Sequence, residues 1–291
     1  MWHALENEIG AFLGRPYRIL DRDLQEQSAR RQIYRLSDGK LSLLVKIGDT
    51  ELQELLKAQA FGLAELSRFG PLRTPEVVCV GATKGFSYLV MEWLNMEEPS
   101  RLGWQRLGEG LAALHQRQDQ AKYGFDQDNF IGDNPQPNPW HKHWYRFFGE
   151  QRLAYQLELL AEKGQALVES EALLDCAGRL LKHHQPSPSL LHGDLWRGNV
   201  GFVDDQPVVF DPACYYGDRE VDLAMTELFG RFDPDFYAAY DDDLALDEQY
   251  ESRRELYNLY HLLNHANLFG GPYLAQAQQS AKRLLDLHRH Q

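Results

Sequence analysis

Cysteine is scarce in this sequence, and its three cysteines, Cys79, Cys176 and Cys214, lie far apart. They have neither the even count of a disulfide framework nor the paired spacing of a zinc site. We therefore expect all three thiols to be reduced and buried. Long apolar runs are missing as well: none has the length that spans a bilayer, and the first residues lack the basic start and apolar core of a signal peptide. These absences predict a cytoplasmic protein with no membrane partner.

Positive charge is also in short supply, because 30 Lys and Arg face 43 Asp and Glu, for a net charge of -13. Nucleic-acid backbones would be repelled without a strong basic patch, and the sequence contains none, so we expect no nucleic-acid partner. The same charge opposes ATP, so a nucleotide site must be locally cationic through a metal ion, lysine or arginine. With 291 residues the chain can form two lobes around one cleft. We expect a monomer or a weak homodimer.

The most informative stretch runs from residue 190 to residue 211. Short apolar runs flank an Asp-Asp pair at 204–205, which predicts a loop that leads into a β-hairpin. Asp194 and Asn199, in an Asp-x4-Asn spacing, precede Asp211 at the end of the next apolar strand. Protein kinases use this spacing for the catalytic Asp, the metal-binding Asn and a second metal-binding Asp. Asp and Asn are also ordinary turn formers, but a chance match that includes the preceding His-Gly pair is on the order of one in ten thousand.

The residues before this stretch have the pattern of a small β-rich lobe. Asp-Gly at 38–39 lies between two apolar runs, which predicts a hairpin and places Lys46 inside a strand. Lys46 is either an edge-strand charge or the lysine that binds nucleotide phosphates, and the stretch at 190–211 favours the second role. Glu92 and Leu94 follow the last strand, where a hinge would present backbone groups to an adenine edge. We predict helices over 2–13 and 50–68, and strands near 17–20 and at 32–36, 41–47, 77–80 and 86–91.

The second part of the chain is predicted to be mainly helical. Apolar periodicity predicts helices over 103–118, 143–163, 169–184, 251–265 and 273–289, with another that begins at residue 220 and a loop over 126–141. The acidic run at 233–251 contains aromatic residues and favours a solvated helix pair over a binding tail. The predicted fold is α+β and two-lobed, like that of protein kinases, with a nucleotide-binding lobe at 1–94 and a helical lobe at 95–291.

This order of elements resembles the aminoglycoside-phosphotransferase branch of the protein-kinase-like fold. Within that branch, the strings at 191–199, 210–225, 262–265 and 268–271 resemble the fructosamine (ketosamine) 3-kinase family, and the similarity continues through residues 147–158. The resemblance implies ATP- and Mg²⁺-dependent phosphorylation of the 3-hydroxyl of a sugar that is attached, as a ketoamine, to a small amine or a protein lysine. It also implies a role in protein deglycation, and for a bacterial member a preference for ribulosamines and erythrulosamines over fructosamines.

The resemblance also implies roles for the residues of the catalytic stretch. Asp194 would accept or orient the proton of the attacking hydroxyl, Asn199 and Asp211 would hold Mg²⁺ between the β- and γ-phosphates, and Lys46 would bind the α- and β-phosphates. His192 would hold the loop in position. The alternative, a buried histidine whose ring nitrogens are hydrogen-bonded, is nearly the same role.

Three further residues have two interpretations each. Asp222 would accept hydrogen bonds from the catalytic-loop backbone, or would only place negative charge at a helix N-terminus. The resemblance implies that the sugar lies between Trp196 and His265. Trp196 offers an indole face to the C–H side of a sugar, or packs between the lobes. His265 lies on an otherwise apolar helix, so a structural role is the alternative.

Two departures from the family pattern concern the nucleotide. Where the family usually has a Gly-Gly pair in its phosphate loop, the aligned residues are Gln27-Ser28-Ala29-Arg30-Arg31. Without glycine the backbone approaches phosphates less freely, so we hypothesise that Arg30 or Arg31 supplies charged contacts instead; exposed loop arginines are the alternative. The glutamate that pairs with the strand lysine aligns with Gln59, so either Glu54 takes over or Lys46 is held less firmly.

Two other functions compete with a ketoamine kinase. One is a related small-molecule kinase for an aminoglycoside, a choline-like alcohol or another sugar, and the strings after Asp211 argue against it. The other is a catalytically weak, pseudokinase-like binding protein, which the glycine-poor loop and Gln59 suggest. The intact set of Asp194, Asn199 and Asp211 argues against that second alternative.

Overall fold

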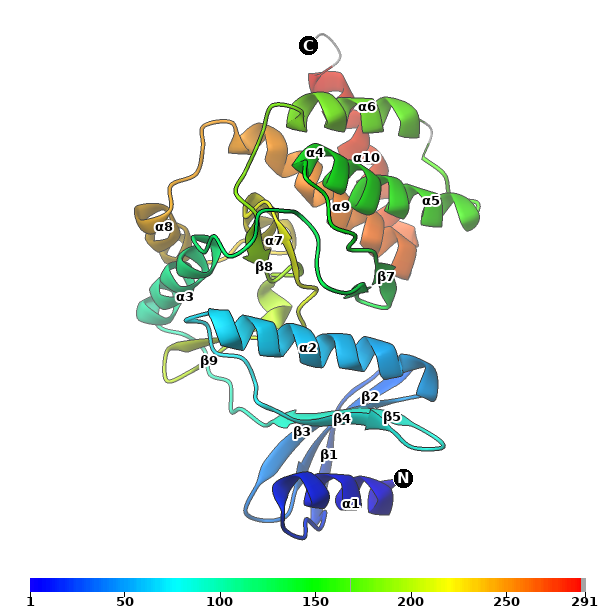
Figure 1. The fold of residues 1–291 in the computed structure, drawn as a ribbon, viewed down its shortest axis with the longest axis vertical. Helices are drawn as coiled ribbons and strands as arrows, with labels where there is room; N and C mark the ends of the chain where they lie inside the picture. The colour runs from blue at the N-terminus through cyan, green and yellow to red at the C-terminus, as the bar shows by residue number, and fades with distance from the viewer. Residues whose placement is uncertain (168, 289–291) are drawn as a thin grey trace.

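The computed structural model describes residues 1–167 and 169–288. Its first lobe contains a five-stranded antiparallel sheet with the order β1-β2-β3-β5-β4 (Figure 1). The strands are β1 (Asp21–Gln27), β2 (Arg31–Ser37), β3 (Ser42–Gly48), β4 (Val77–Ala82) and β5 (Ser87–Glu92). Helix α1 (Trp2–Leu13) covers one face of the sheet, and helix α2 (Gln53–Phe69), which follows the 3-10 turn η1 (Thr50–Leu52), lies between the other face and the second lobe.

Side chains along β3 point alternately to the two faces of the sheet, so the strand contributes to two hydrophobic cores. Val45 and Ile47 are buried against α1, whereas Leu44 faces the side covered by α2. The β2–β3 register pairs Ile33 with Lys46, and β5 places Leu89 on the other side of Lys46. Because side chains alternate at each residue of a strand, Lys46 shares the face of Leu44 and points toward the second lobe rather than into the α1 core.

The second lobe is mainly helical and has one large hydrophobic core. Residues 149–154 form a π-helical turn, so the predicted helix over 143–163 is continuous but changes its winding in the middle. The helices are α3 (Arg101–His115), α4 (Trp144–Phe148), η2 (Gly149–Ala154), α5 (Tyr155–Glu162), α6 (Ser170–Leu181), η3 (Arg197–Asn199), α7 (Glu220–Leu228), α8 (Pro234–Asp243), α9 (Tyr250–Phe269) and α10 (Gly271–Leu287). The short strands are β6 (Asn129–Ile131), β7 (Asn134–Gln136), β8 (Ser189–Leu191), β9 (Val200–Val203), β10 (Gln206–Val209) and β11 (Tyr215–Gly217).

Several predicted elements were wrong. The strand expected near 17–20 begins at Asp21, because Tyr17 is buried in the α1 core from an irregular segment. The loop predicted over 126–141 contains the β6–β7 hairpin. The acidic run forms one helix, α8, with Phe236 and Tyr240 buried, instead of a solvated helix pair. Cys79 is only partly buried, whereas Cys176 and Cys214 are buried, and all three are free thiols. The last predicted helix ends at Leu287, and residue 289 lies outside the described residues.

A backbone hydrogen bond joins the two lobes, because the Val209 amide donates to the Arg73 carbonyl at 2.9 Å. Just after the predicted boundary, the Glu97 amide donates to the Phe202 carbonyl at 2.8 Å within the second lobe. Helix α2 also approaches the segment after Asp211, because a Cβ atom at Gly62 would lie 3.0 Å from the Pro212 side chain. We keep the lobe boundary between residues 94 and 95 as a prediction.

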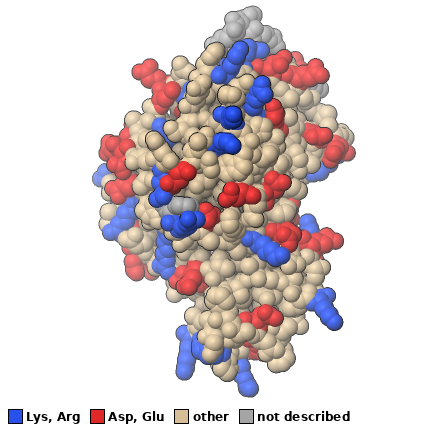
Figure 2. Space-filling view, in the orientation of Figure 1, with Lys and Arg blue, Asp and Glu red and all other residues tan. Residues whose placement is uncertain are grey.

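Charged side chains of both signs are interspersed over the described part of the face drawn in Figure 2, without a broad basic patch. This arrangement agrees with the acidic composition of the chain. None of the helices in the described ranges combines the length and the apolar character that crossing a membrane requires.

Candidate active site

A cleft of about 560 Å³ lies between the sheet of the first lobe and the second lobe. Apolar side chains of both lobes form part of its wall. Most of the residues singled out from the sequence line it, namely Arg31, Lys46, Gln59, Glu92, Leu94, Asp194, Trp196, Asn199, Asp211 and His265. Arg30, His192 and Asp222 do not line the cleft.

Lys46 connects the lobes across this cleft. Its side chain is only 3% exposed, and its Nζ atom forms an ion pair with Asp211 Oδ1 and donates a hydrogen bond to Gln59 Oε1 at 3.3 Å. Burial opposes ionisation of Asp211, but the Lys46 ammonium outweighs it and holds the pKa of this carboxyl below its usual value. Glu54 does not take over from Gln59, because its carboxylate binds Lys57 on the exposed side of α2.

Asp194 and Asn199 form the centre of the site. The Asn199 Nδ2 atom donates to the Asp194 carbonyl at 2.8 Å and to Asp194 Oδ2 at 3.1 Å, while Asp194 Oδ1 is buried with no hydrogen-bond partner. Burial raises the pKa of Asp194 to about 7, although the Asn199 amide favours the charged form. Because a buried polar atom without a partner is costly, Asp194 Oδ1 is ready to accept a proton or a hydrogen bond from a bound hydroxyl.

The side-chain oxygens at this point fit a hard cation. Since Asn199 uses its nitrogen to bind Asp194, its amide oxygen is left for another partner. Asp211 lies next to it, because the Phe210 amide donates to the Asn199 carbonyl at 3.1 Å. Asp211 also adopts a left-handed backbone conformation with φ 55°, which turns its carboxylate sharply after the strand. Carboxylate and amide oxygens are ligands that Mg²⁺ prefers.

Asp222 and His192 hold the catalytic loop from behind. Asp222 is fully buried at the start of α7 and accepts hydrogen bonds from the His192 and Gly193 amides, both at 2.8 Å, and from His115 Nε2 at 3.2 Å. His192 Nδ1 accepts from the Asp194 amide at 3.3 Å, so its Nε2 carries the proton and donates to the Phe210 carbonyl at 3.0 Å. The two side chains thus connect α7, the loop and the segment that carries Asp211.

Glu92 and Leu94 lie on the hinge side of the cleft, and they differ in whether their polar groups already have hydrogen-bond partners. The Glu92 amide donates to the Glu76 carbonyl at 2.8 Å, and the Glu92 carboxylate binds Arg73 at 2.6 Å. No hydrogen bond of the Leu94 backbone amide is recorded among the described residues. Leu94, rather than Glu92, therefore has the available backbone donor on this side of the cleft.

Aromatic rings surround the opposite end of the cleft. His265 Nδ1 bonds the His261 carbonyl at 2.9 Å, which makes Nδ1 the protonated nitrogen and leaves Nε2 as an acceptor. Burial lowers the pKa of His265, which keeps the ring neutral. Phe229, at the end of α7, lies 4.5 Å from the His265 ring and 6.3 Å from the Trp196 ring. Tyr273 packs 5.1 Å from His265. Phe229 and Tyr273, which do not line the cleft but pack against its aromatic side chains, were not predicted from the sequence, because only tertiary packing brings them there.

A buried polar network below these rings was also missed. Asn264, which lines the cleft, receives a hydrogen bond from Asn134 Nδ2 at 2.8 Å and one from Gln156 Nε2 at 3.3 Å. The Arg152 guanidinium, on the π-helical turn, lies 4.0 Å from the Tyr215 ring and binds Asn138 Oδ1 at 2.6 Å. Such networks fix the positions of the elements that they join, here α5, α9 and the β6–β7 hairpin.

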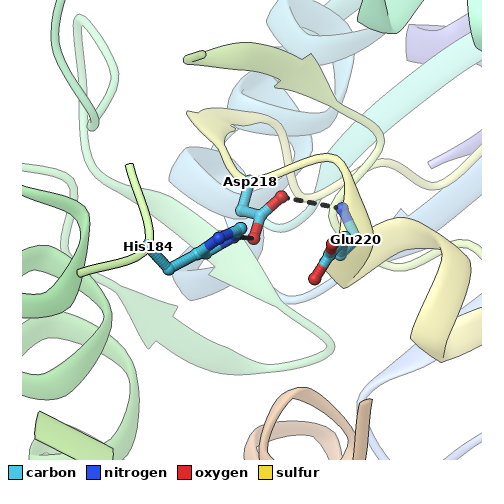
Figure 3. Close-up of side chains that lie close together, drawn as sticks. All are labelled: His184, Asp218 and Glu220. Atoms are coloured by element: carbon cyan, nitrogen blue, oxygen red, sulfur yellow. Dashed lines mark hydrogen bonds and ion pairs between the residues drawn. The ribbon is translucent and has the colours of Figure 1, made fainter. Parts of the chain in front are cut away.

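A second cluster of potential metal ligands lies away from the cleft (Figure 3). Ligand atoms of His184, Asp218 and Glu220 lie within 4.8 Å of one another. However, His184 Nε2 bonds Asp218 at 2.6 Å, the Tyr257 hydroxyl donates to the same carboxylate at 2.6 Å, and Arg253 binds both oxygens of Glu220 at 2.7 Å. Since protein donors occupy these oxygens, the cluster is a structural connection between α7, α9 and the segment before β8.

Comparisons with known proteins agree with this site. The chain matches the family model described as fructosamine kinase over residues 1–287. A protein named "Probable ketoamine kinase" from Vibrio parahaemolyticus is 43% identical over 288 residues, which cover 98% of this chain and 99% of that protein. A protein of the same name from Escherichia coli K12 is 41% identical over 285 residues, which cover 98% and 99%.

Solved structures agree as well. The crystal structure of a "Putative fructosamine-3-kinase" from Haemophilus somnus 129PT has a TM-score of 0.94 and 33% identity, with 98% of each chain covered. Aminoglycoside phosphotransferase APH(4)-Ia shares the fold, with a TM-score of 0.67 at 13% identity over 98% of this chain and 99% of that chain.

Proposed function

The chain belongs to the fructosamine kinase family, and on that premise we propose that it transfers the γ-phosphoryl group of ATP to the 3-hydroxyl of ketoamines. The observation that carries this proposal is the meeting of Lys46 with Asp211 across the cleft, beside Asp194 and Asn199. A lysine, two carboxylates and an amide in one cleft are what phosphoryl transfer to an alcohol requires. The family model and the relatives do not favour the aminoglycoside-kinase or the pseudokinase alternative.

Asp194 positions the acceptor hydroxyl in this mechanism. Its unpartnered Oδ1 atom accepts the hydroxyl proton, while Asn199 fixes the other oxygen. Orientation matters more than basicity here, because the transition state of phosphoryl transfer is loose and the proton leaves late. His192 and Asp222 keep the loop, and therefore Asp194, in this position.

Lys46, Asn199 and Asp211 bind the nucleotide end. Lys46 contacts the α- and β-phosphates and is kept in place by Gln59 and Asp211. Asn199 Oδ1 and the Asp211 carboxylate would hold Mg²⁺, which neutralises charge on the β- and γ-phosphates. The adenine lies against the hinge, where the Leu94 backbone binds its edge.

The acceptor lies at the aromatic end of the cleft. Trp196 offers an apolar ring face to the sugar, and His265 accepts a hydrogen bond from a sugar hydroxyl through Nε2. Phe229 contacts both rings and sets the distance between them. Phe269, which lines the cleft and is 66% exposed, covers the outer side, where the amine half of a ketoamine would leave the cleft.

The cellular part of the proposal is coarser. We propose a cytoplasmic enzyme of protein deglycation that acts on free and protein-bound ketoamines, with ribulosamines and erythrulosamines preferred over fructosamines, and that functions as a monomer or a weak homodimer. Its three free thiols suit a reducing compartment.

A panel of synthetic ketoamines tests the proposal. Purified protein with ATP and Mg²⁺ should release ADP in proportion to a sugar phosphate whose 3-position carries the phosphorus by NMR. The Asp194→Asn variant should bind ATP normally but lose at least about 100-fold in kcat. ADP release without a ketoamine phosphate, or equal activity on aminoglycosides, would contradict the proposal.

A further inference from the structure

The turn between β1 and β2 adjoins the cleft, contains no glycine, and binds two of its own backbone amides. The Ser28 amide donates to the Arg31 carbonyl at 2.8 Å, and the Arg31 amide lies 3.2 Å from Ser28 Oγ. Two amides that a glycine-rich loop would offer to phosphates are therefore already hydrogen-bonded within the turn. If a nucleotide is to be held from this side, side chains must supply much of the contact.

The two arginines of this turn lie in different environments. Arg30 points outward, with its guanidinium 3.8 Å from Asp49 and 3.5 Å from Glu51. Arg31 is the first residue of β2, two positions before Ile33, and Ile33 pairs with Lys46. Because residues two apart in a strand share a face, Arg31 lies on the same face as Ile33 and Lys46, and all three line the cleft.

Within the described residues the Arg31 guanidinium forms no hydrogen bond or ion pair, although its charge helps to lower the pKa of Asp211 across the cleft. Its Nε atom is buried without a hydrogen bond. Arg35 and Arg152 also have a buried, unbonded Nε, but their terminal nitrogens are hydrogen-bonded to side chains or carbonyls. No side-chain hydrogen bond or ion pair of Arg31 is recorded within residues 1–167 and 169–288. In a chain with a net charge of -13, a cation that faces a cleft and forms no ion pair with a carboxylate of the described residues is placed for an anion from outside.

From these observations we propose that Arg31 is a direct ligand of the nucleotide's polyphosphate, and that its side chain replaces part of the backbone cradle of a glycine-rich loop. The proposal rests on the nucleotide site of the proposed function. Lys46 and Arg31 occupy diagonal positions on neighbouring strands, about 7–8 Å apart in a typical sheet, so a chain of phosphates can contact both. The planar guanidinium fork suits two phosphate oxygens at once.

Nucleotide binding without any acceptor tests this inference. Titration calorimetry with Mg·ATP, Mg·ADP and adenosine should be carried out on the wild type and on Arg31→Ala, with Arg30→Ala as the matched control from the outer side of the same turn. We expect Arg31→Ala to weaken ATP and ADP binding by roughly 10- to 100-fold, because a charge-assisted hydrogen bond is lost. Adenosine binding should be unchanged, and Arg30→Ala should stay within about twofold of the wild type for every ligand.

A conservative variant separates a phosphate ligand from a structural role. Arg31→Lys keeps the charge but loses the fork, so its ATP affinity should lie between those of the wild type and Arg31→Ala, at an unchanged melting temperature. Equal losses of ATP and adenosine affinity, or unchanged ATP affinity in Arg31→Ala, would overturn the inference. A wild type that binds ATP through Arg31 but phosphorylates no ketoamine would instead contradict the proposed function, so the two failures are distinguishable.

Discussion

Replacing Asp222 by alanine should destabilise the protein through the catalytic loop. Asp222 is fully buried and accepts two loop amides at 2.8 Å and His115 Nε2 at 3.2 Å. The alanine variant leaves these donors buried without an acceptor. Removing one partner of a buried, hydrogen-bonded charge in this way lowers the free energy of unfolding by about 3–5 kcal/mol. The matched control is Asp233→Ala, because Asp233 caps α8 with a single bond to the Asp235 amide, and such a cap contributes ~1 kcal/mol.

Urea unfolding at pH 7, followed by fluorescence, measures both variants. We expect the Asp222→Ala midpoint to fall by roughly 1 M or more and the control midpoint to fall by a few tenths of 1 M. At urea concentrations where the variant is folded, kcat should also fall, because Asp194 is no longer oriented. If Asp222→Ala lowers the urea midpoint less than Asp233→Ala does, Asp222 does not support the catalytic loop. Its negative charge would then act only at the start of α7.

The pH dependence of this contribution has a definite sign. Burial opposes ionisation of Asp222, but His115, His192 and the loop amide of Gly193 outweigh it, so its pKa in the folded state lies below the ordinary value. The unfolded chain therefore binds more protons at low pH. The stabilisation is fully present above the unfolded pKa of about 3.9 and is lost as the pH falls through the folded pKa. The difference between wild type and Asp222→Asn should be constant from pH 8 to about 5 and should shrink below about 4.

Three further predictions concern the cleft itself. Lys46→Met should lower kcat/KM for ATP by about 100-fold or more in steady-state assays, and a change below about threefold would contradict its phosphate role. Chelation of divalent cations should abolish turnover, and Asn199→Ala should raise the Mg²⁺ concentration for half-maximal activity about tenfold; an unshifted Mg²⁺ curve would exclude Asn199 as a ligand. His265→Ala should raise KM for the ketoamine while KM for ATP stays constant, and Phe269→Ala should do the same only for ketoamines of bulky amines; equal effects on both substrates would indicate a folding defect.

Local sequence was sufficient to predict the centre of the site. The Asp-Gly turn between two apolar runs placed Lys46 inside a strand. Asp194, Asn199 and Asp211 belong to one loop and hairpin, so short-range geometry brings them together. The structure adds the ion pair between Lys46 and Asp211, which connects residues 165 positions apart. The contact between Lys46 and Gln59 also supports the alignment in which Gln59 replaces a glutamate.

The remaining features depend on packing that a single sequence does not reveal. The β6–β7 hairpin has the polar composition of a loop, but its Asn and Gln side chains are buried because Asn129, Asn134 and Gln136 each donate a hydrogen bond to a distant segment. Arg30 and Arg31 are adjacent residues of the same type, so the sequence alone does not indicate which of them faces the cleft. Arg31 faces the cleft because it lies in β2 two residues before Ile33, the partner of Lys46, whereas Arg30 lies in the turn. Phe229 reaches the site because α7 ends beside α9, which no local pattern indicates.

The contact between Lys46 and Asp211 has a consequence for turnover. In the proposed function these two side chains bind the nucleotide, and in the structure their ion pair also joins the two lobes. On that proposal, separation of the lobes breaks the ion pair, and an incoming triphosphate competes with Asp211 for the same ammonium. The rate at which ADP leaves the proposed site should therefore depend on the strength of the Lys46–Asp211 contact.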